Sequence, residues 1–282
     1  MKNRRAVLHS VLCLAIACFP ASAQVKAAPP GQRELRVLFI GNSYTWFNNL
    51  PHLVTALAES AHQARPLRTA MLAGPGFTLR NHWDAGAAVS AIQGSSWDYV
   101  VLQEQSMLGS AAPAVNGVPR LDPRLFHEYA RRFDAAIKQV GAKTVFFLTW
   151  ARQDFPELQS VLNKAYLSIA KELGDRVAPV GPAWKEAIDA RPRLDLHQRD
   201  RSHPTPAGSY LAACVFYATL YGESPEGLTA QIEADASGIT DFRLLEAPLG
   251  GPFPLRGVDL SQSDARLLQR IAWRVVKKAS AR

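Results

Sequence analysis

Short apolar runs alternate with longer amphipathic segments along the chain from residue 35 onward. Consecutive apolar side chains fit strands that are buried on both faces, as in a parallel sheet covered by helices. The segments between them have the period of helices with one buried face. The sequence therefore predicts a three-layer α/β/α fold with a central parallel sheet of about five strands. The predicted strands are Arg36–Ile40, Leu67–Leu72, Tyr99–Leu102, Thr144–Thr149 and Val177–Val180.

Start and stop signals define two of the predicted helices. In the first, Asp122 suits the N-cap position, Pro123 the first helical position and Gly141 the end. The second extends from about Pro156 to Leu173. The expected inward positions are Phe126, Ala130, Phe133, Ile137 and Val140 in the first helix, and Leu158, Leu162, Ala165, Ile169 and Leu173 in the second.

The first 23 residues have the pattern of a secretory signal peptide. Basic residues precede an apolar run over Ala6–Phe19, and the small residues Ala21, Ser22 and Ala23 follow it. That run is shorter than the roughly 20 residues of a membrane-spanning helix, and we expect no membrane span elsewhere. The chain is therefore expected to be exported, to the periplasm or the cell exterior.

The remaining sequence predicts one folded domain with a terminal helix. Residues 24–34 are rich in Ala, Pro and Gln and are expected to form a disordered leader. The domain should cover residues 35–260, with frequent Gly and Pro between Gly238 and Gly257. A last helix within 261–282, capped at Ser261, should pack on the same domain.

Charge does not indicate a nucleic-acid partner. Removing the three basic residues of the signal peptide lowers the formal charge from +8 to +5. The other Lys and Arg residues are scattered among acidic ones on predicted helix faces, without a basic run. We therefore expect no nucleic-acid binding, and the sequence leaves the oligomeric state unknown.

Cysteine and histidine spacing predicts neither a metal site nor a cofactor. Cys13 and Cys18 fall within the signal peptide, so Cys214 would be the one cysteine of the exported chain and is expected in the core. The three histidines without paired ligands at metal spacing are expected to be surface or structural residues. They are His82, His127 and His197.

Ligands of an open parallel sheet bind beyond the carboxyl ends of the strands, so residues that follow the strands are the first candidates for chemistry. The first predicted strand runs directly into Gly41, Asn42 and Ser43. Taken alone, a serine at this place is more often a turn residue than a nucleophile.

A second candidate motif lies late in the chain, at Asp200-x-x-His203. Thr205 can cap the next helix and Pro206 can begin it, which would hold the histidine on a rigid turn. The Asp200 carboxylate can reach one imidazole nitrogen and leave the other free as a base. A structural role for this histidine is about equally consistent with the motif alone.

Together, four blocks resemble the SGNH, or GDSL-like, serine hydrolase family. They are Gly41-Asn42-Ser43, Gly76, Gln105 and Asp200-x-x-His203-Pro204, in the family's order. The resemblance implies the flavodoxin-like arrangement of the α/β/α fold. It further implies Ser43 as nucleophile, His203 as base and Asp200 as its orienting acid. Backbone N–H groups of Ser43 and Gly76, with the Gln105 side chain, would form the oxyanion hole.

Two positions depart from the family pattern, and neighbouring residues leave alternatives open. Asn42 stands where the family usually has Asp, and Gln105 where it has the Asn that donates to the oxyanion. Gln103 is an alternative to Gln105. Gly74 is a rival of Gly76, and Glu104 either orients the donor, lines the pocket or is only a polar strand end.

Aromatic residues near the strand ends are candidates for a substrate platform. Position alone motivates the hypothesis that Trp46 and Trp150 bind substrate, although most aromatic residues of such folds lie in the core.

The favoured function is hydrolysis of carboxylic esters, such as O-acetyl carbohydrates or short acyl esters, through an acyl-enzyme on Ser43. The expected partner is thus a small-molecule or carbohydrate ester. Transfer of the acyl group to another acceptor is a close variant. A non-catalytic carbohydrate-binding protein of the same fold is the alternative from a different class.

Overall fold

The computed structural model describes residues 33–109, 111–115, 118–235 and 255–281. The predicted signal peptide, nearly all of the predicted leader and most of the stretch from Gly238 to Gly257 lie outside these ranges. Within them, no helix is both long enough and apolar enough to cross a lipid bilayer.

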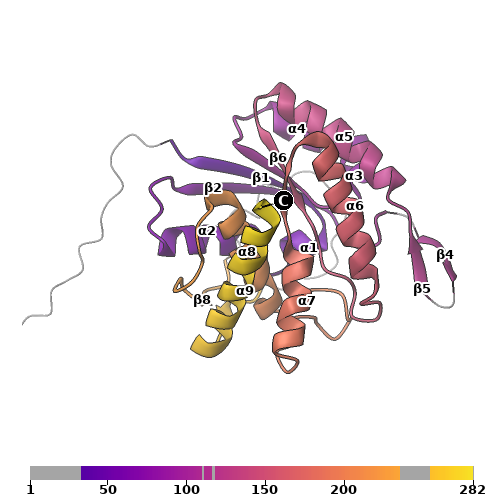
Figure 1. Ribbon diagram of the computed structural model, residues 1–282. Coiled ribbons are helices and arrows are strands. Elements are labelled where there is room, and N and C mark those ends of the chain that lie inside the picture. The colour runs from indigo at the N-terminus through magenta and orange to yellow at the C-terminus, as the bar shows by residue number, and fades with distance from the viewer. Residues whose placement is uncertain (1–32, 110, 116–117, 236–254, 282) are drawn as a thin grey trace, which may run out of the picture.

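A parallel five-stranded sheet forms the middle layer (Figure 1). Its strand order is β2-β1-β3-β6-β7, and the register aligns Leu35 with Leu67 and Val37 with Tyr99. This arrangement confirms the predicted α/β/α class. The strands are β1 (Leu35–Gly41), β2 (Leu67–Ala73), β3 (Tyr99–Leu102), β6 (Lys143–Phe147) and β7 (Arg176–Ala178).

Helices cover both faces of the sheet (Figure 1). Side chains of β1 alternate between two cores: Val37 and Phe39 belong to one, whereas Leu38 and Ile40 belong to the other. The first core contains residues of α1 (Ser43–Trp46), α2 (Leu50–Ser60), α7 (Val180–Ala190), α8 (Pro206–Tyr221) and α9 (Gln262–Ser280). The second contains residues of α3 (Leu79–Asp84), α4 (Ala87–Gln93), α5 (Arg124–Gln139) and α6 (Leu158–Leu173).

Short elements complete the described chain. A 3₁₀ turn, η1 (Phe47–Asn49), joins α1 to α2. Two antiparallel pairs lie outside the main sheet, and neither was predicted from the sequence. They are β4 (Ala111–Val115) with β5 (Val118–Leu121), and β8 (Gln231–Ile232) with β9 (Val258–Asp259).

Several predicted boundaries differ from the structure by one or two residues. The last strand ends at Ala178 because Val180 begins α7. Helix α5 begins at Arg124, one residue after the predicted start, although the Asp122 Oδ1 atom still accepts its N–H at 3.0 Å. The expectation that Val140 faces inward is wrong, because it caps the end of α5 and is 37% exposed.

The start of α8 follows the predicted capping pattern. Thr205 Oγ1 accepts the N–H of Gly208 at 3.2 Å and donates to the Asp195 carbonyl at 2.7 Å. This helix is buried on nearly every side, so an unpaired N–H at its start has no ready access to water.

Replacing Thr205 by alanine should lower the free energy of unfolding by about 1 kcal/mol, because the N-cap acceptor is lost. Urea denaturation followed by circular dichroism measures this change. Thr205→Ser keeps the hydroxyl and should remain close to wild type. Equal unfolding midpoints for Thr205→Ala and wild type would show that the cap contributes nothing.

Candidate active site

Ser43 lies at the first residue of α1, immediately beyond the carboxyl end of β1. The turn is tight: a Cβ atom on Gly41 would lie 2.4 Å from Thr45 Oγ1 and 2.5 Å from Gln103 Oε1. Only glycine fits there without displacement of these side chains. The strand-to-helix turn therefore presents Ser43 at the edge of the sheet where ligands of this fold class bind.

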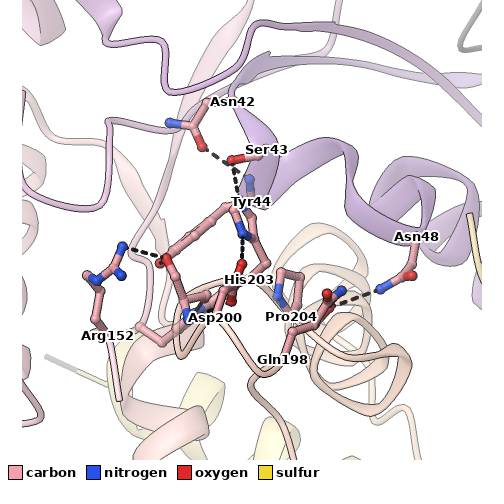
Figure 2. A network of polar contacts seen from close by, with 11 residues as sticks. Asn42, Ser43, Tyr44, Asn48, Arg152, Gln198, Asp200, His203 and Pro204 are labelled. Carbon is pink, nitrogen blue, oxygen red and sulfur yellow. Dashed lines mark hydrogen bonds and ion pairs between the residues drawn. The ribbon is translucent and has the colours of Figure 1, made fainter. Parts of the chain in front are cut away.

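His203 and Asp200 lie on the loop before α8, opposite the Ser43 turn (Figure 2). The His203 Nε2 atom is 2.9 Å from Ser43 Oγ, and Nδ1 is hydrogen-bonded to Asp200 Oδ2. An imidazole that donates from Nδ1 has its Nε2 lone pair free to accept the serine proton. The three predicted catalytic residues are thus within hydrogen-bonding distance in the order that nucleophilic catalysis requires.

The turn that carries His203 is held by the same carboxylate. Asp200 Oδ1 accepts the backbone N–H groups of Ser202 at 3.0 Å and His203 at 2.9 Å, while Arg201 between them takes φ +60°. Burial pushes the pKa of Asp200 upward, but the hydrogen bonds from the His203 ring and these N–H groups outweigh it and hold the pKa below its usual value. Asp200 therefore stays ionised at neutral pH and can stabilise an imidazolium.

Aromatic rings fix the imidazole from two sides. Phe47 stacks on His203 with a centroid distance of 4.2 Å, and Tyr44 meets it edge-on at 5.8 Å. Ser43 keeps 9% of its surface exposed, and the His203 side chain keeps 27%. Both side chains are thus ordered but still reachable from solvent.

The surroundings of Trp150 do not favour the predicted contact with substrate. Its side chain is fully buried and stacks between the rings of Tyr44 and Trp184, with centroid distances of 4.4 Å and 3.9 Å. Its Nε1 donates to the Ser202 carbonyl at 3.0 Å, and this hydrogen bond stabilises the turn before His203. Trp46 is 7% exposed and stacks on Phe47, and its contact with substrate stays a prediction.

Asn42 caps α1 and ties the Ser43 turn to the loop after β2. Its Oδ1 accepts the N–H of Tyr44 at 3.1 Å, while its Nδ2 donates to the Phe77 carbonyl at 2.9 Å. Asp at this position has no N–H to offer that carbonyl and would place two acceptors against each other. This double role gives a physical reason for Asn at this position.

The two candidate glycines of the oxyanion hole differ in their partners. Gly74 donates its N–H to the Gly41 carbonyl at 3.2 Å, which occupies the donor. Gly76 takes φ +66°, and a Cβ added there would meet no atom within 4 Å. The open space beside Gly76 favours its N–H over that of Gly74 as an oxyanion donor.

The two candidate glutamines also differ. Gln103 is fully buried, and its Oε1 accepts from Asn42 N at 2.9 Å and Thr45 Oγ1 at 2.8 Å. Its Nε2 donates to the Glu104 carbonyl at 2.7 Å, so Gln103 joins β1 to the loop after β3. Gln105 is half-buried, and among the described residues its Nε2 has one long contact, of 3.4 Å, with Ser106 Oγ. Gln105 is therefore the better candidate for an amide donor.

Ser202 was missed by the sequence reasoning. Its Oγ is 2.7 Å from the Tyr44 hydroxyl and accepts from Arg152 Nη1 at 3.0 Å, which joins three segments behind the triad. Its place directly before His203 is the only signal in the sequence.

The three histidines that were predicted to be surface or structural residues lie apart from one another and contact backbone carbonyls. His82 is buried and its Nε2 lies 2.6 Å from the Gly41 carbonyl, while burial lowers its pKa to about 4. His127 Nε2 contacts the Ala165 carbonyl, and His197 Nε2 contacts the Ala151 carbonyl. Among the described residues, no group of three or more His, Cys, Asp or Glu is placed to hold a metal ion.

Comparisons with known proteins give a structural likeness only. No family model matches the chain, and no curated protein matches it. A DUF4886 family protein from Bacteroides uniformis superposes with a TM-score of 0.55 at 15% identity, over 87% of this chain and 95% of its own. LAE5, an alpha/beta hydrolase enzyme from a lake metagenome, superposes with a TM-score of 0.54 at 17% identity, over 66% of this chain and 94% of its own. An acetylxylan esterase from Geobacillus stearothermophilus superposes with a TM-score of 0.53 at 17% identity, over 66% of this chain and 93% of its own. At these identities the likeness establishes the shared fold.

Proposed function

We propose that this protein is a serine esterase that hydrolyses carboxylic esters through an acyl-enzyme on Ser43. The single observation that carries the proposal is the 2.9 Å contact between His203 Nε2 and Ser43 Oγ, with Asp200 on the other imidazole nitrogen. A histidine oriented by a carboxylate is the arrangement that activates a weakly acidic hydroxyl. Solved structures of the same fold that include esterases support it.

The reaction has two halves. In the first, Ser43 Oγ attacks the ester carbonyl carbon as its proton moves to His203 Nε2, and the tetrahedral oxyanion forms. Collapse breaks the bond to the alcohol oxygen, which takes the proton from His203 and leaves the acyl group on Ser43. In the second, His203 takes a proton from water as it attacks the acyl carbon, and Ser43 recovers its proton when the acid leaves.

The oxyanion hole would consist of the N–H groups of Ser43 and Gly76 and the Gln105 amide. Each such donor, aimed at the developing charge, contributes on the order of 3 kcal/mol to catalysis in serine hydrolases. The positive φ of Gly76 and its open surroundings support its part in this set.

The substrate class that we favour is an O-acetyl carbohydrate or a short acyl ester met outside the cytoplasm. The signal-peptide pattern of residues 1–23 and the acetylxylan esterase among the similar folds support this choice. A small acyl group also fits a nucleophile that is 9% exposed beside the Phe47 and Tyr44 rings.

A fluorophosphonate probe tests the proposed nucleophile without knowledge of the substrate. Wild-type protein should take up one probe per chain on the peptide that contains Ser43, as measured by mass spectrometry, because the activated hydroxyl attacks phosphorus. Ser43→Ala should remain unlabelled. Folded wild-type protein that takes up no probe would contradict the esterase proposal and favour a non-catalytic binding protein.

A further inference from the structure

Glu104 is a buried carboxyl group directly after β3. It is 2% exposed, and within the described ranges no basic side chain forms an ion pair with it. Its two oxygens instead accept backbone N–H groups: Oε1 from Gln105 at 2.6 Å and Oε2 from Leu79 at 3.2 Å. Burial of a carboxyl group without a cation is costly, so its presence here calls for a role beyond filling space.

The backbone of Glu104 is fixed as firmly as its side chain. Its N–H donates to the Tyr166 hydroxyl of α6 at 3.1 Å, and its carbonyl accepts from Gln103 Nε2 at 2.7 Å. Gln103 in turn accepts the N–H of Asn42 beside the nucleophile. The carboxylate is therefore anchored to the sheet edge that carries Ser43.

The two N–H groups that Glu104 accepts belong to the two loops that supply the proposed oxyanion donors. Leu79 lies three residues after Gly76, at the first position of α3. Gln105 is the proposed amide donor itself. One carboxylate thus spans the distance between the loop after β2 and the loop after β3.

We propose that Glu104 is a positioning residue, which sets the Gly76 N–H and the Gln105 amide relative to Ser43 by holding both loops. The inference rests on the proposed esterase function and deepens it. None of the hydrogen bonds of Glu104 among the described residues reaches Ser43, so its effect on the reaction would pass through the two loops.

The charge state of Glu104 changes near neutral pH. Burial raises its pKa to about 7, although the N–H groups of Gln105 and Leu79 act in the opposite direction. The titratable group that faces Glu104 from α6 is Tyr166, and burial raises the pKa of its hydroxyl. On α3, burial lowers the pKa of His82 to about 4. Tyr166 and His82 are both neutral around pH 7, so Glu104 titrates there without a change in their charge.

The first test compares kcat and KM for short-chain p-nitrophenyl esters in wild type, Glu104→Gln and Glu104→Ala. Glutamine keeps one acceptor oxygen, so kcat should fall about tenfold; alanine keeps none, and kcat should fall about 100-fold, on the scale of one misplaced oxyanion donor. KM should stay within about twofold, because the donors act on the transition state and not on the bound ester.

Asp175→Asn is the matched control. Asp175 is also a buried carboxyl group, 6% exposed, but it lies at the opposite end of the sheet, just before β7. Burial and the neighbouring Asp134 raise its pKa as well. Its replacement should leave kcat unchanged, which separates positioning of the donors from general loss of a buried acid.

A second measurement needs no substrate and tests the Glu104 bridge, which is the pair of hydrogen bonds from the Leu79 and Gln105 N–H groups to the Glu104 carboxylate. In ¹⁵N NMR spectra of wild-type protein, the Leu79 and Gln105 amides should shift with a common midpoint near pH 7 as Glu104 ionises. In Glu104→Gln this shared transition should vanish. Leu79 and Gln105 amides that titrate with different midpoints would overturn the inference. This test does not depend on whether Glu104→Ala folds.

The two measurements distinguish the inference from the proposed function. Lower kcat in Glu104→Gln together with a shared amide transition supports the inference. Unchanged kcat in Glu104→Gln, in an enzyme that Ser43→Ala inactivates, overturns it and leaves the esterase proposal standing. A folded wild type with neither ester hydrolysis nor probe labelling overturns both.

Discussion

Replacing His203 by alanine should lower kcat by about 10⁵- to 10⁶-fold, with KM nearly unchanged. Loss of the histidine alone costs about this much in serine hydrolases, because the serine proton then has no acceptor and the leaving alcohol has no donor. In this structure His203 Nε2 is the ring nitrogen within 2.9 Å of Ser43 Oγ. Initial rates measured over a range of p-nitrophenyl acetate concentrations, up to saturating substrate, give the residual kcat and KM.

His127→Ala provides the matched control for this loss. His127 lies on α5, where its Nε2 contacts the Ala165 carbonyl away from the triad. The same chemical change there should leave kcat within about twofold of wild type. A His203→Ala variant that kept more than about one tenth of wild-type kcat would contradict the role of His203 as base.

The fold and the turn that carries Asp200 and His203 were predictable because both follow from local patterns. The strand Arg36–Ile40 was recognised from consecutive apolar residues, and it places Ser43 at a strand end. The Asp200-x-x-His203 spacing allows the carboxylate to reach the imidazole within one turn, and the structure has that contact. Capping of α8 by Thr205 is likewise contained within four residues.

Contacts between distant segments were beyond the sequence pattern. Trp150 follows a strand as a pocket residue would, but stacking on Tyr44 and Trp184 buries it completely. The choice between Gly74 and Gly76 depends on a hydrogen bond to Gly41, 33 positions earlier in the chain. The Glu104 bridge likewise depends on Leu79, which only the packing of α3 against the sheet edge brings near.

Gly41 shows how packing constrains a position that the sequence marks only as a turn. Its carbonyl accepts the Gly74 N–H and lies 2.6 Å from His82 Nε2, while its missing side chain leaves room for Thr45 and Gln103. The turn that presents Ser43 is thus fixed by contacts with the neighbouring loops. This dependence explains why a strand-to-serine pattern alone was insufficient to identify a nucleophile.

Ser43→Ala should abolish ester hydrolysis, with kcat lowered by about 10⁶-fold, because within the described part of the chain Ser43 Oγ is the group hydrogen-bonded to His203 Nε2. Ser90→Ala, at an exposed position of α4, is the control for loss of a serine hydroxyl and should keep wild-type activity. Circular dichroism of each variant verifies that the fold is intact.

The central claim is tested most directly by hydrolysis of p-nitrophenyl acetate by folded wild-type protein and Ser43→Ala, measured side by side. The proposed mechanism predicts measurable turnover in wild type and only the background rate of the ester in Ser43→Ala. Equal turnover by the two proteins would contradict the assignment of Ser43 as nucleophile.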